Sequence, residues 1–547
     1  MILIQSCRMK KVLKMKKVLT LLMSIAVIAP LAATAVDATT VPQTSYQLDY
    51  EYGFALGQQW GPAYRLIVNT SWKPPELSDA RALQTASNHV EALRKYYPEQ
   101  LARLQGLSDA VGIDLLKVVA TSIYLPPLIF KGCTTGAAAP PATKDGEVYL
   151  VWSADLWAFP LLFPILPIIN IPAMLVGLVS PLFGFLMTIP LKQLLVTIPP
   201  LAVASPPGKN RYIMLGIPLI AGIGLLNDKG LALVGNACST SDCGEGLTAI
   251  EIPNLIMERC STAKEAAEFI EGTERFSSSG FALFNLNYLW ADAEGGIASV
   301  EATYNYFAVA YSGDDEGHFE YVGGEVLKTP GTTGILGQGN HHQYLDYHET
   351  GAPSPGPDGY QSSWMRCARM WELLRENYGN IDLEKAQSFL CDRANGPTMF
   401  GIEQGGFNSI CRTEFPIGWI DYYTGSINHR YMHGGKPAWF GDLVLFGPDN
   451  CDIALVTQPK ERIIWWAAGW PTVFSFHPIY CAELLDVEGP SLSSSDGLIT
   501  GIMNGGVKLF SMLGNCIQML PPSLTTFLSN LIVRLLKTLA HIMEKMP

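Results

Sequence analysis

The sequence carries little charge and lacks several motifs that mark common classes of protein. Charged residues make up 16% of the 547 residues, and the net charge is −12. Because nucleic acid binds to basic surfaces, this balance argues against a nucleic-acid partner. No glycine-rich phosphate loop with its lysine, no CxxC pair and no HExxH motif occurs, so nucleotide-driven chemistry and a zinc site have no support. The adjacent His341 and His342 are weak metal ligands by themselves, and we expect neither a metal nor a cofactor.

Apolar residues, in contrast, are abundant. Hydrophobic residues make up 48% of the chain, and the mean hydropathy is +0.18. Such a composition is apolar for a soluble protein and indicates contact with lipid or a large apolar core. The length is enough for one large domain or for two to three ordinary ones, and no internal repeat is evident.

Residues 1–38 have the features of a secretory signal peptide. A lysine-rich start precedes an apolar run from Val18 to about Ala33, and small residues that suit cleavage follow. The alternative is a retained membrane anchor, although the run is slightly short for a bilayer span. We therefore expect an exported, extracytoplasmic protein. Export permits disulfides, and Cys238 and Cys243 are close enough in the sequence to close a small loop.

Two further segments do not fit a compact soluble domain. Residues 156–204 carry one charge, Lys192, and their recurring prolines would interrupt a continuous helix. This pattern favours an apolar lid or a shallow membrane-dipping loop over a true span, with core filler as the remaining alternative. In the tail, residues 491–547, the stretch "SLTTFLSNLIVRLLKTLAHIMEKMP" places apolar residues on one helical face and basic residues largely opposite. This amphipathic helix predicts association with a lipid interface or packing on the protein's own body.

The segments between these predict an α+β arrangement. Residues 46–131 have apolar stripes at helical spacing, whereas strand patterns with glycine-bearing turns begin at Val148. Thr262 and Glu265 have the spacing of a capping box, which opens a helix. Strand runs that alternate with helix pairs predict helices packed on sheets. Helices after the first strands are expected over four stretches: 247–260, 262–272, 363–377 and 381–392.

The stretch "KGCTTGAAAPPATKDGEVYLVWSAD", residues 131–155, places Cys133 between a glycine and two threonines, with Asp155 at the end of the next strand. A cysteine there is a buried thiol, half of a disulfide or a catalytic nucleophile. No histidine lies near it in the sequence to serve as its base. If the chain is cut between Gly132 and Cys133, however, the new α-amino group, with a pKa of about 8, can take the thiol proton. The thiol itself would make the cut by attacking the preceding carbonyl.

Eight motifs, in order over about residues 50 to 470, extend this interpretation. Together they resemble the acyl-coenzyme A:6-aminopenicillanic-acid acyltransferase (isopenicillin N acyltransferase-like) family of N-terminal-nucleophile hydrolases. The motifs are "YEYGFALGQQWG" (50–61), "YPEQLARLQGLSDAVGI" (97–113), "GCTT" (132–135) with the strand that ends at Asp155, "NDKGLALVGNACS" (227–239), "ASVEAT" (298–303, with Glu301), "GNHH" (339–342), "SSWMRCARMWELL" (362–374) and "SICRT" (409–413).

The resemblance implies a four-layer αββα sandwich of N-terminal-nucleophile hydrolase type, to which this chain adds the apolar insert and the amphipathic C-terminal tail. It also implies self-cleavage between Gly132 and Cys133. Residues 39–132 would then be a helical pro-segment, and residues 133–490 would be the hydrolase domain, with the insert at 156–204.

The resemblance assigns a role to each matching residue. Cys133 would supply both the nucleophilic sulfur and the amino-group base. Asn236 would donate to the oxyanion of the tetrahedral intermediate. Asp155 would hold the new α-ammonium group or the substrate amine, and Arg366 would pair with a carboxylate, for which Asp155 is one candidate. Ser363 would sit beside Arg366.

The implied function is that of a thiol-dependent amidase or acyltransferase acting on a C–N bond of an apolar N-acyl compound. Hydrolysis is favoured, because an exported protein is separated from intracellular acyl-coenzyme A. The strand reads "VWSAD" where the family often has "QNWD" or "RNLD", and the insert begins directly after Asp155. We expect the insert to receive an apolar acyl group or to dock to a membrane. The alternatives are a phospholipase B-like esterase of the same superfold and an inactive, membrane-associated binding protein.

Overall fold

A computed structural model describes fourteen stretches of the chain: 45–73, 77–125, 130–156, 201–276, 285–312, 319–321, 333–352, 361–395, 398–399, 402–403, 408–411, 453–468, 471 and 476–485. The predicted signal peptide, the tail at 491–547 and residues 157–200 of the predicted insert lie outside these stretches. Residues 201–204, the last four of the predicted insert, form a strand.

The predicted helical pattern of residues 46–131 is confirmed over 45–124. Its helices are α2 (Ser45–Ser71), α3 (Asp79–Tyr96), α4 (Pro98–Val111) and α5 (Leu115–Tyr124). Local sequence sets several ends: the Ser78 and Asp114 side chains accept backbone N–H groups at the starts of α3 and α5, and Gly112 ends α4 at φ 67°. Helices α2 and α4 cross closely, since a Cβ on Gly53 or on Gly106 would lie within 2.0 Å of a backbone oxygen of the other helix.

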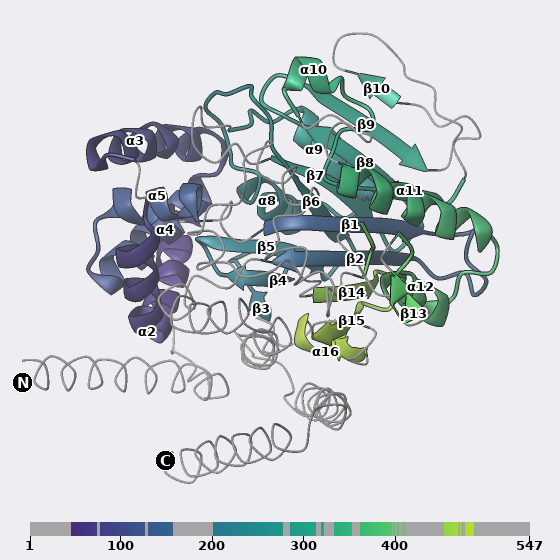
Figure 1. The fold of residues 1–547 in the computed structure, drawn as a ribbon. Helices are drawn as coiled ribbons and strands as arrows, with labels where there is room; N and C mark the ends of the chain where they lie inside the picture. The colour runs from purple at the N-terminus through teal and green to yellow at the C-terminus, as the bar shows by residue number, and fades with distance from the viewer. Residues whose placement is uncertain are drawn as a thin grey trace, which may run out of the picture.

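Most of the described strands build two large antiparallel sheets (Figure 1). The first sheet has the order β11-β1-β2-β14-β15-β16 and the second the order β10-β9-β8-β7-β6-β5-β4-β3. The strands of the first sheet are β1 (Phe130–Ala138), β2 (Tyr149–Leu156), β11 (Ile335–Gln338), β14 (Ile453–Gln458), β15 (Ile463–Ala468) and β16 (His477–Tyr480). The strands of the second are β3 (Leu201–Ala204), β4 (Tyr212–Ile217), β5 (Ala221–Asn227), β6 (Ala232–Cys238), β7 (Asn285–Ala291), β8 (Ile297–Ala302), β9 (Phe307–Ser312) and β10 (Phe319–Tyr321).

All four helices predicted after the first strands are present. They are α8 (Glu251–Arg259), α9 (Ala263–Glu271), α11 (Gln361–Glu376) and α12 (Leu383–Leu390), and Thr262 and Glu265 form the expected capping box before α9. Smaller elements are α10 (Tyr347–Thr350), α16 (Cys481–Leu485) and the hairpin of β12 (Thr398–Met399) with β13 (Ile402–Glu403).

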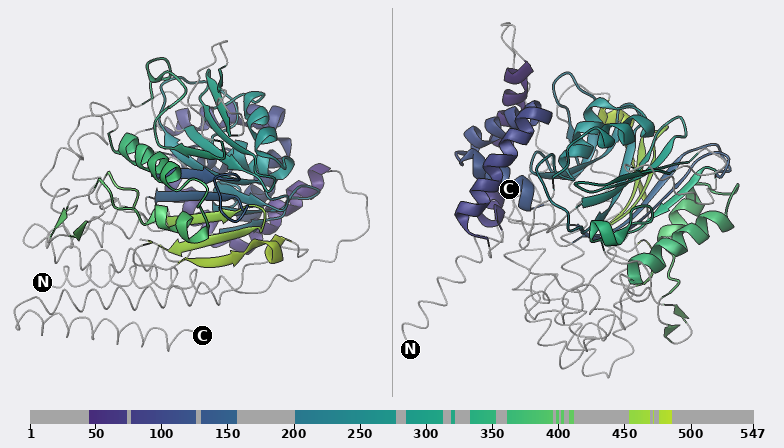
Figure 2. Two further views of the ribbon diagram at one scale, coloured as in Figure 1. Left: turned by 90° about the vertical axis from the view of Figure 1, so that its right-hand side faces the viewer. Right: turned by 90° about the horizontal axis from the view of Figure 1, so that it is seen from above.

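Alternate residues of β1 face two different cores. Cys133 and Ala137 belong to the apolar cluster shared by the two sheets, whereas Ala138 joins a second cluster with Met370 of α11. A Cβ on Gly136 would lie 2.7 Å from the Met370 sulfur, so α11 lies tightly against this strand. Helices α11 and α12 therefore cover one face of the first sheet, the second sheet covers its other face, and α8 and α9 lie against the second sheet (Figure 2). The predicted α+β class is confirmed.

A buried ion cluster joins the N-terminal helices to this layered body. The Arg103 side chain of α4, 2% exposed, lies 2.8 Å from Asp49 of α2 and 2.5 Å from Glu258 of α8. The Tyr97 hydroxyl also donates to Glu258. Burial raises the pKa of Asp49, and the Arg103 charge opposes that rise. The guanidinium is therefore what allows two carboxylates to lie in the interior.

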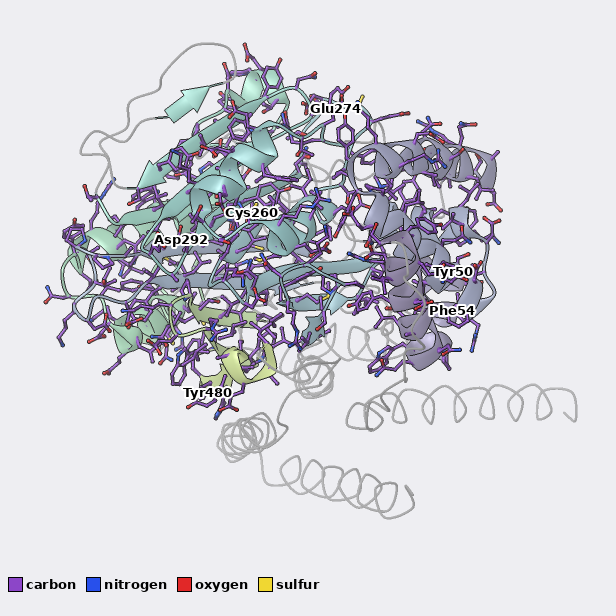
Figure 3. All side chains as sticks on the ribbon, turned by 180° about the vertical axis from the view of Figure 1, so that it is seen from behind. Tyr50, Phe54, Cys260, Glu274, Asp292 and Tyr480 are labelled. Carbon is purple, nitrogen blue, oxygen red and sulfur yellow. The ribbon has the colours of Figure 1, made fainter. Side chains whose placement is uncertain are left out.

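Further polar contacts join the N-terminal helices to the body, one near solvent and one in the interior. Lys95 of α3 lies 3.2 Å from Glu274, which Figure 3 places where the helices meet the body. In the interior, the ring nitrogen Nε2 of His89 lies 3.0 Å from Glu251 of α8. The N-terminal helices therefore make buried side-chain contacts with α8, which packs on the second sheet. Within the described stretches, no helix combines the length and apolarity needed to cross a bilayer.

Replacing Arg103 with alanine should lower the free energy of unfolding by about 3 to 5 kcal/mol, because two buried carboxylates would lose their counter-charge. Chemical denaturation of the full chain measures this change. Arg94→Ala is the matched control in the neighbouring helix, since it removes an exposed pair with Glu91 and should leave the midpoint unchanged. An Arg103→Ala protein that unfolds at the wild-type midpoint would show that the cluster is dispensable.

Candidate active site

Cys133 lies in β1, buried between the two sheets with 1% of its surface exposed. In the ladder with β2, Cys133 is opposite Ala154, and Gly132 is opposite Asp155. The register shifts between Phe130 and Gly132, so the regular pairing is interrupted just before the Gly132–Cys133 bond. The hairpin thus brings the Asp155 backbone beside the predicted cleavage point. The Asp155 side chain is outside the described part of the structure.

Asn340 holds the backbone nitrogen of Cys133. The Cys133 N–H donates to Asn340 Oδ1 at 2.9 Å, and Asn340 Nδ2 donates to the carbonyl of Ala237 in β6 at 2.8 Å. Asn340 follows β11, which pairs with β1 at Thr135 and Gln338. Its carboxamide therefore bridges the two sheets at the position of the predicted nucleophile.

Arg366 of α11 approaches the same residue from the other side of the sheet. Its Nη1 donates to the Cys133 carbonyl and to Thr134 Oγ1, its Nη2 donates to Asn340 Oδ1 at 3.0 Å, and its Nε donates to Ser362 Oγ at 3.2 Å. The side chain is buried, so this cation is not a surface helix charge. The predicted pairing of Arg366 with Asp155 stays a prediction, because it involves a side chain that lies outside the described part.

Ser363 orients Asn340 rather than Arg366. Its Oγ accepts the Asn340 N–H at 2.6 Å and lies 2.8 Å from His341 Nδ1. Burial, together with the nearby Arg366 charge, lowers the pKa of His341 to about 4, so the imidazole is neutral at neutral pH. The next residue, His342, is also buried and contacts Thr350 Oγ1 at 3.0 Å.

Asn236 lies in β6, fully buried and facing β1. Its Nδ2 donates to Thr135 Oγ1 at 2.7 Å, two residues beyond Cys133 on the same strand face. The carboxamide has a second N–H, and an Asn donor of this kind can stabilise an oxyanion that forms next to the nucleophile. The structure thus brings Cys133, Arg366, Ser363 and Asn236 into one region of the core.

The motifs "GNHH" and "ASVEAT" contain Asn340 and Glu301, but the sequence predicts a role for neither residue. Asn287 of β7 was not singled out, yet its Nδ2 donates to the carbonyls of Gly339 at 3.1 Å and His341 at 2.9 Å. The available signal was an asparagine within a strand pattern, Asn287, followed by the Asn340–His341 pair after a later strand. Nothing local in the sequence indicates that the two would meet.

The pairing and the pKa values of the other cysteines bear on whether they could act as the nucleophile. The eight in the described stretches form no disulfide with one another, and the predicted Cys238–Cys243 pair is wrong: Cys238 is buried at the end of β6, whereas Cys243 is exposed in the following loop. Burial raises the pKa of Cys260 and of Cys367 to about 12, which keeps both thiols protonated. Within the described part, His, Cys, Asp and Glu side chains form no group of three that could hold a metal ion.

No family model matches the chain, and no curated protein matches it either. Solved structures similar to it include two variants of conjugated bile acid hydrolase from Clostridium perfringens. Each is 12% identical and covers 66% of this chain, with TM-scores of 0.28 and 0.31 over 96% and 97% of the hydrolase chain. Penicillin V acylase from Agrobacterium tumefaciens is 11% identical over 63% of this chain and 84% of its own, with a TM-score of 0.25. TM-scores this low leave the likeness too distant to establish the chemistry of this chain.

Asn340→Ala should slow any reaction at Cys133 by about 10²-fold, because the backbone nitrogen and Arg366 would both lose the oxygen that fixes their positions. Asn380→Ala is a control on the surface, where the side chain makes a long contact, 3.4 Å, with the Tyr378 carbonyl. The measurement is the time course of chain cleavage after synthesis in a cell-free system. Equal time courses for wild type and Asn340→Ala would remove Asn340 from the site.

Proposed function

We propose that the chain is a self-processing cysteine N-terminal-nucleophile enzyme that acts on the C–N bond of an apolar N-acyl compound, as an amidohydrolase or an acyltransferase. One observation carries the proposal. Side chains from separate elements hold the backbone of a single cysteine, with Asn340 on its nitrogen and Arg366 on its carbonyl. A site built around the backbone nitrogen of Cys133 suits a reaction in which that nitrogen becomes a functional group.

The first step is cleavage of the chain. The Cys133 sulfur attacks the Gly132 carbonyl carbon, the C–N bond breaks, and the nitrogen takes the thiol proton. Water then hydrolyses the resulting thioester, which leaves the Gly132 carboxylate and a free α-amine on Cys133. In the uncut chain Cys133 is buried, so the proposal includes movement of the residues before it once they are released.

The second step repeats this chemistry on a substrate. The α-amine takes the thiol proton, the sulfur attacks the substrate carbonyl, and the oxyanion accepts a hydrogen bond from Asn236. The departing amine takes the proton from the α-ammonium group, and water or another amine resolves the thioester on Cys133. We assign Asp155 to hold the ammonium group. Burial leaves Cys260 and Cys367 protonated, so neither competes as nucleophile.

Purified wild-type chain should give two fragments by mass spectrometry that meet between Gly132 and Cys133, and Cys133→Ala should give one uncut chain. Cys260→Ala is the matched control, because it removes another buried thiol and should be cut normally. Turnover is then assayed with N-acyl amino acids, N-acyl ethanolamines, simple penicillins and the matching esters. Preference for esters would favour the phospholipase B-like alternative. An uncut wild-type chain that also resists thiol alkylation would favour the inactive binding protein.

We also propose that the protein is exported and works at a membrane surface, with residues 156–204 receiving the apolar acyl group. The support is compositional: an N-terminal signal-like stretch, a nearly uncharged insert and an amphipathic tail. Deleting residues 523–547 should release the protein from lipid vesicles in a sedimentation assay. If the shortened chain sediments as fully as the intact one, the tail is not the membrane contact.

A further inference from the structure

Glu301 is a buried carboxylate for which the proposed reaction has no use. It lies in β8 with none of its surface exposed, and its strand partner on β7 is Asn287. Taking a carboxylate out of water is unfavourable unless hydrogen bonds replace its hydration. The contacts that do so are therefore informative.

Every described hydrogen-bond partner of this carboxylate is a donor. Oε1 accepts the backbone N–H of Gln343 at 2.7 Å and lies 3.5 Å from the Gln338 amide nitrogen. Oε2 accepts the N–H groups of Tyr344 and Leu345, each at 3.0 Å. The ionised form can accept from all three backbone N–H groups, whereas a proton on Oε2 would point at one of the two donors of that oxygen.

These donors belong to the segment that carries Asn340. The loop at 339–345, between β11 and α10, is held by Asn287 through two carbonyls and by Glu301 through three N–H groups. Strands β7 and β8 are neighbours in the second sheet (Figure 1), and their Asn287 and Glu301 side chains fix the backbone on either side of Asn340. The Asn340 side chain then reaches Cys133 N at 2.9 Å.

We propose that Glu301 is a positioning residue: its ionised carboxylate holds the 339–345 loop so that Asn340 meets the backbone nitrogen of Cys133. The inference rests on the proposed function, because it concerns the geometry of the same nucleophile. Glu301 acts through the loop and does not touch the reacting atoms.

The ionisation of Glu301 falls in an accessible pH range. Burial raises its pKa to about 7, and the three backbone donors limit that rise. The groups that face it titrate elsewhere: burial raises the pKa of Cys238 and Tyr344 well above neutrality and that of Cys367 to about 12. In the loop, burial lowers the pKa of His341 to about 4 and of His342 to about 3.

Because of this pKa, the free energy of unfolding and the rate of self-cleavage should change in opposite directions with pH. A folded-state pKa of about 7 lies above the ordinary value of 4.5, so the folded chain binds more protons than the unfolded chain between these values. Glu301 therefore makes the fold less stable as the pH rises from about 4.5 to 7. Cleavage, which needs the ionised form, should instead become faster through pH 7. A residue that only stabilised the fold would not produce this opposition.

The experiment compares self-cleavage of wild type and Glu301→Gln from pH 5.5 to 8.5. The α-amine of Cys133 forms only after cleavage, so its ionisation does not affect this rate. Both chains contain the Cys133 thiol, so the ratio of the wild-type rate to the variant rate removes any effect of pH on that thiol. We expect the variant to be slower by about 10 to 10²-fold at pH 8. The ratio of wild-type to variant rates should be about tenfold smaller at pH 6 than at pH 8, as a pKa of about 7 requires.

Two further variants separate positioning from general destabilisation. Glu251→Gln alters a buried carboxylate at the helix junction and should change stability while its rate ratio stays flat with pH. Glu301→Asp keeps the charge with a shorter side chain, so it should cleave slowly with the wild-type pH profile. If Glu301→Gln does not fold, Glu301→Asp alone tests the positioning role.

The outcomes distinguish failure of the proposed function from failure of the positioning role alone. A wild-type chain that is never cut overturns both the proposed function and this inference. A cut wild type with a flat ratio for Glu301→Gln, or a Glu301→Asp chain that cleaves at the wild-type rate, overturns only the positioning role. A ratio that falls as the pH rises would assign Glu301 to fold stability alone.

Discussion

The hold on the Cys133 backbone is the interaction on which the rest of the site depends. Asn340 accepts its N–H, and Arg366 donates both to its carbonyl and to the same Asn340 oxygen. One carboxamide oxygen therefore couples a strand, a loop and a helix. Because that oxygen accepts from both donors, movement of any one element weakens the contacts of the other two.

A polar layer inside an apolar sandwich makes this hold possible. Thr135, Asn236, Asn287, Glu301 and Asn340 are all buried, and several of their hydrogen bonds run between strands of different sheets or to the 339–345 loop. Buried polar groups are unfavourable unless they are satisfied, so such a layer specifies one relative placement of the sheets. Apolar side chains alone would tolerate small shifts between the sheets.

The N-terminal helices are built into the body by a different kind of contact. The buried Arg103 with two carboxylates, and His89 with Glu251, lie between α2–α4 and α8. Their attachment therefore does not depend on the peptide link that precedes β1. If the chain is cut at Gly132–Cys133, these contacts provide a physical reason for the helical segment to remain bound, which the term pro-segment does not convey.

The sequence by itself determined the features that arise from neighbours in the chain. Helical periodicity predicted 46–131 and the four later helices, the Thr262 capping box predicted the start of α9, and the local β1–β2 hairpin placed Asp155 opposite Gly132. The resemblance marked Cys133, Asn236 and Arg366 without stating how they meet. The Cys238–Cys243 prediction failed because closeness in sequence says nothing about which side chain the fold buries.

Only the tertiary structure decided which distant residues touch. Asn340 is 207 positions from Cys133, and Arg366 is 233 positions away, yet both contact it because β11 pairs with β1 and α11 lies across that strand. Glu301 and the loop it holds come together across two sheets. Strand order and sheet packing follow from burial of apolar surface over the whole chain, a long-range effect that no local pattern encodes.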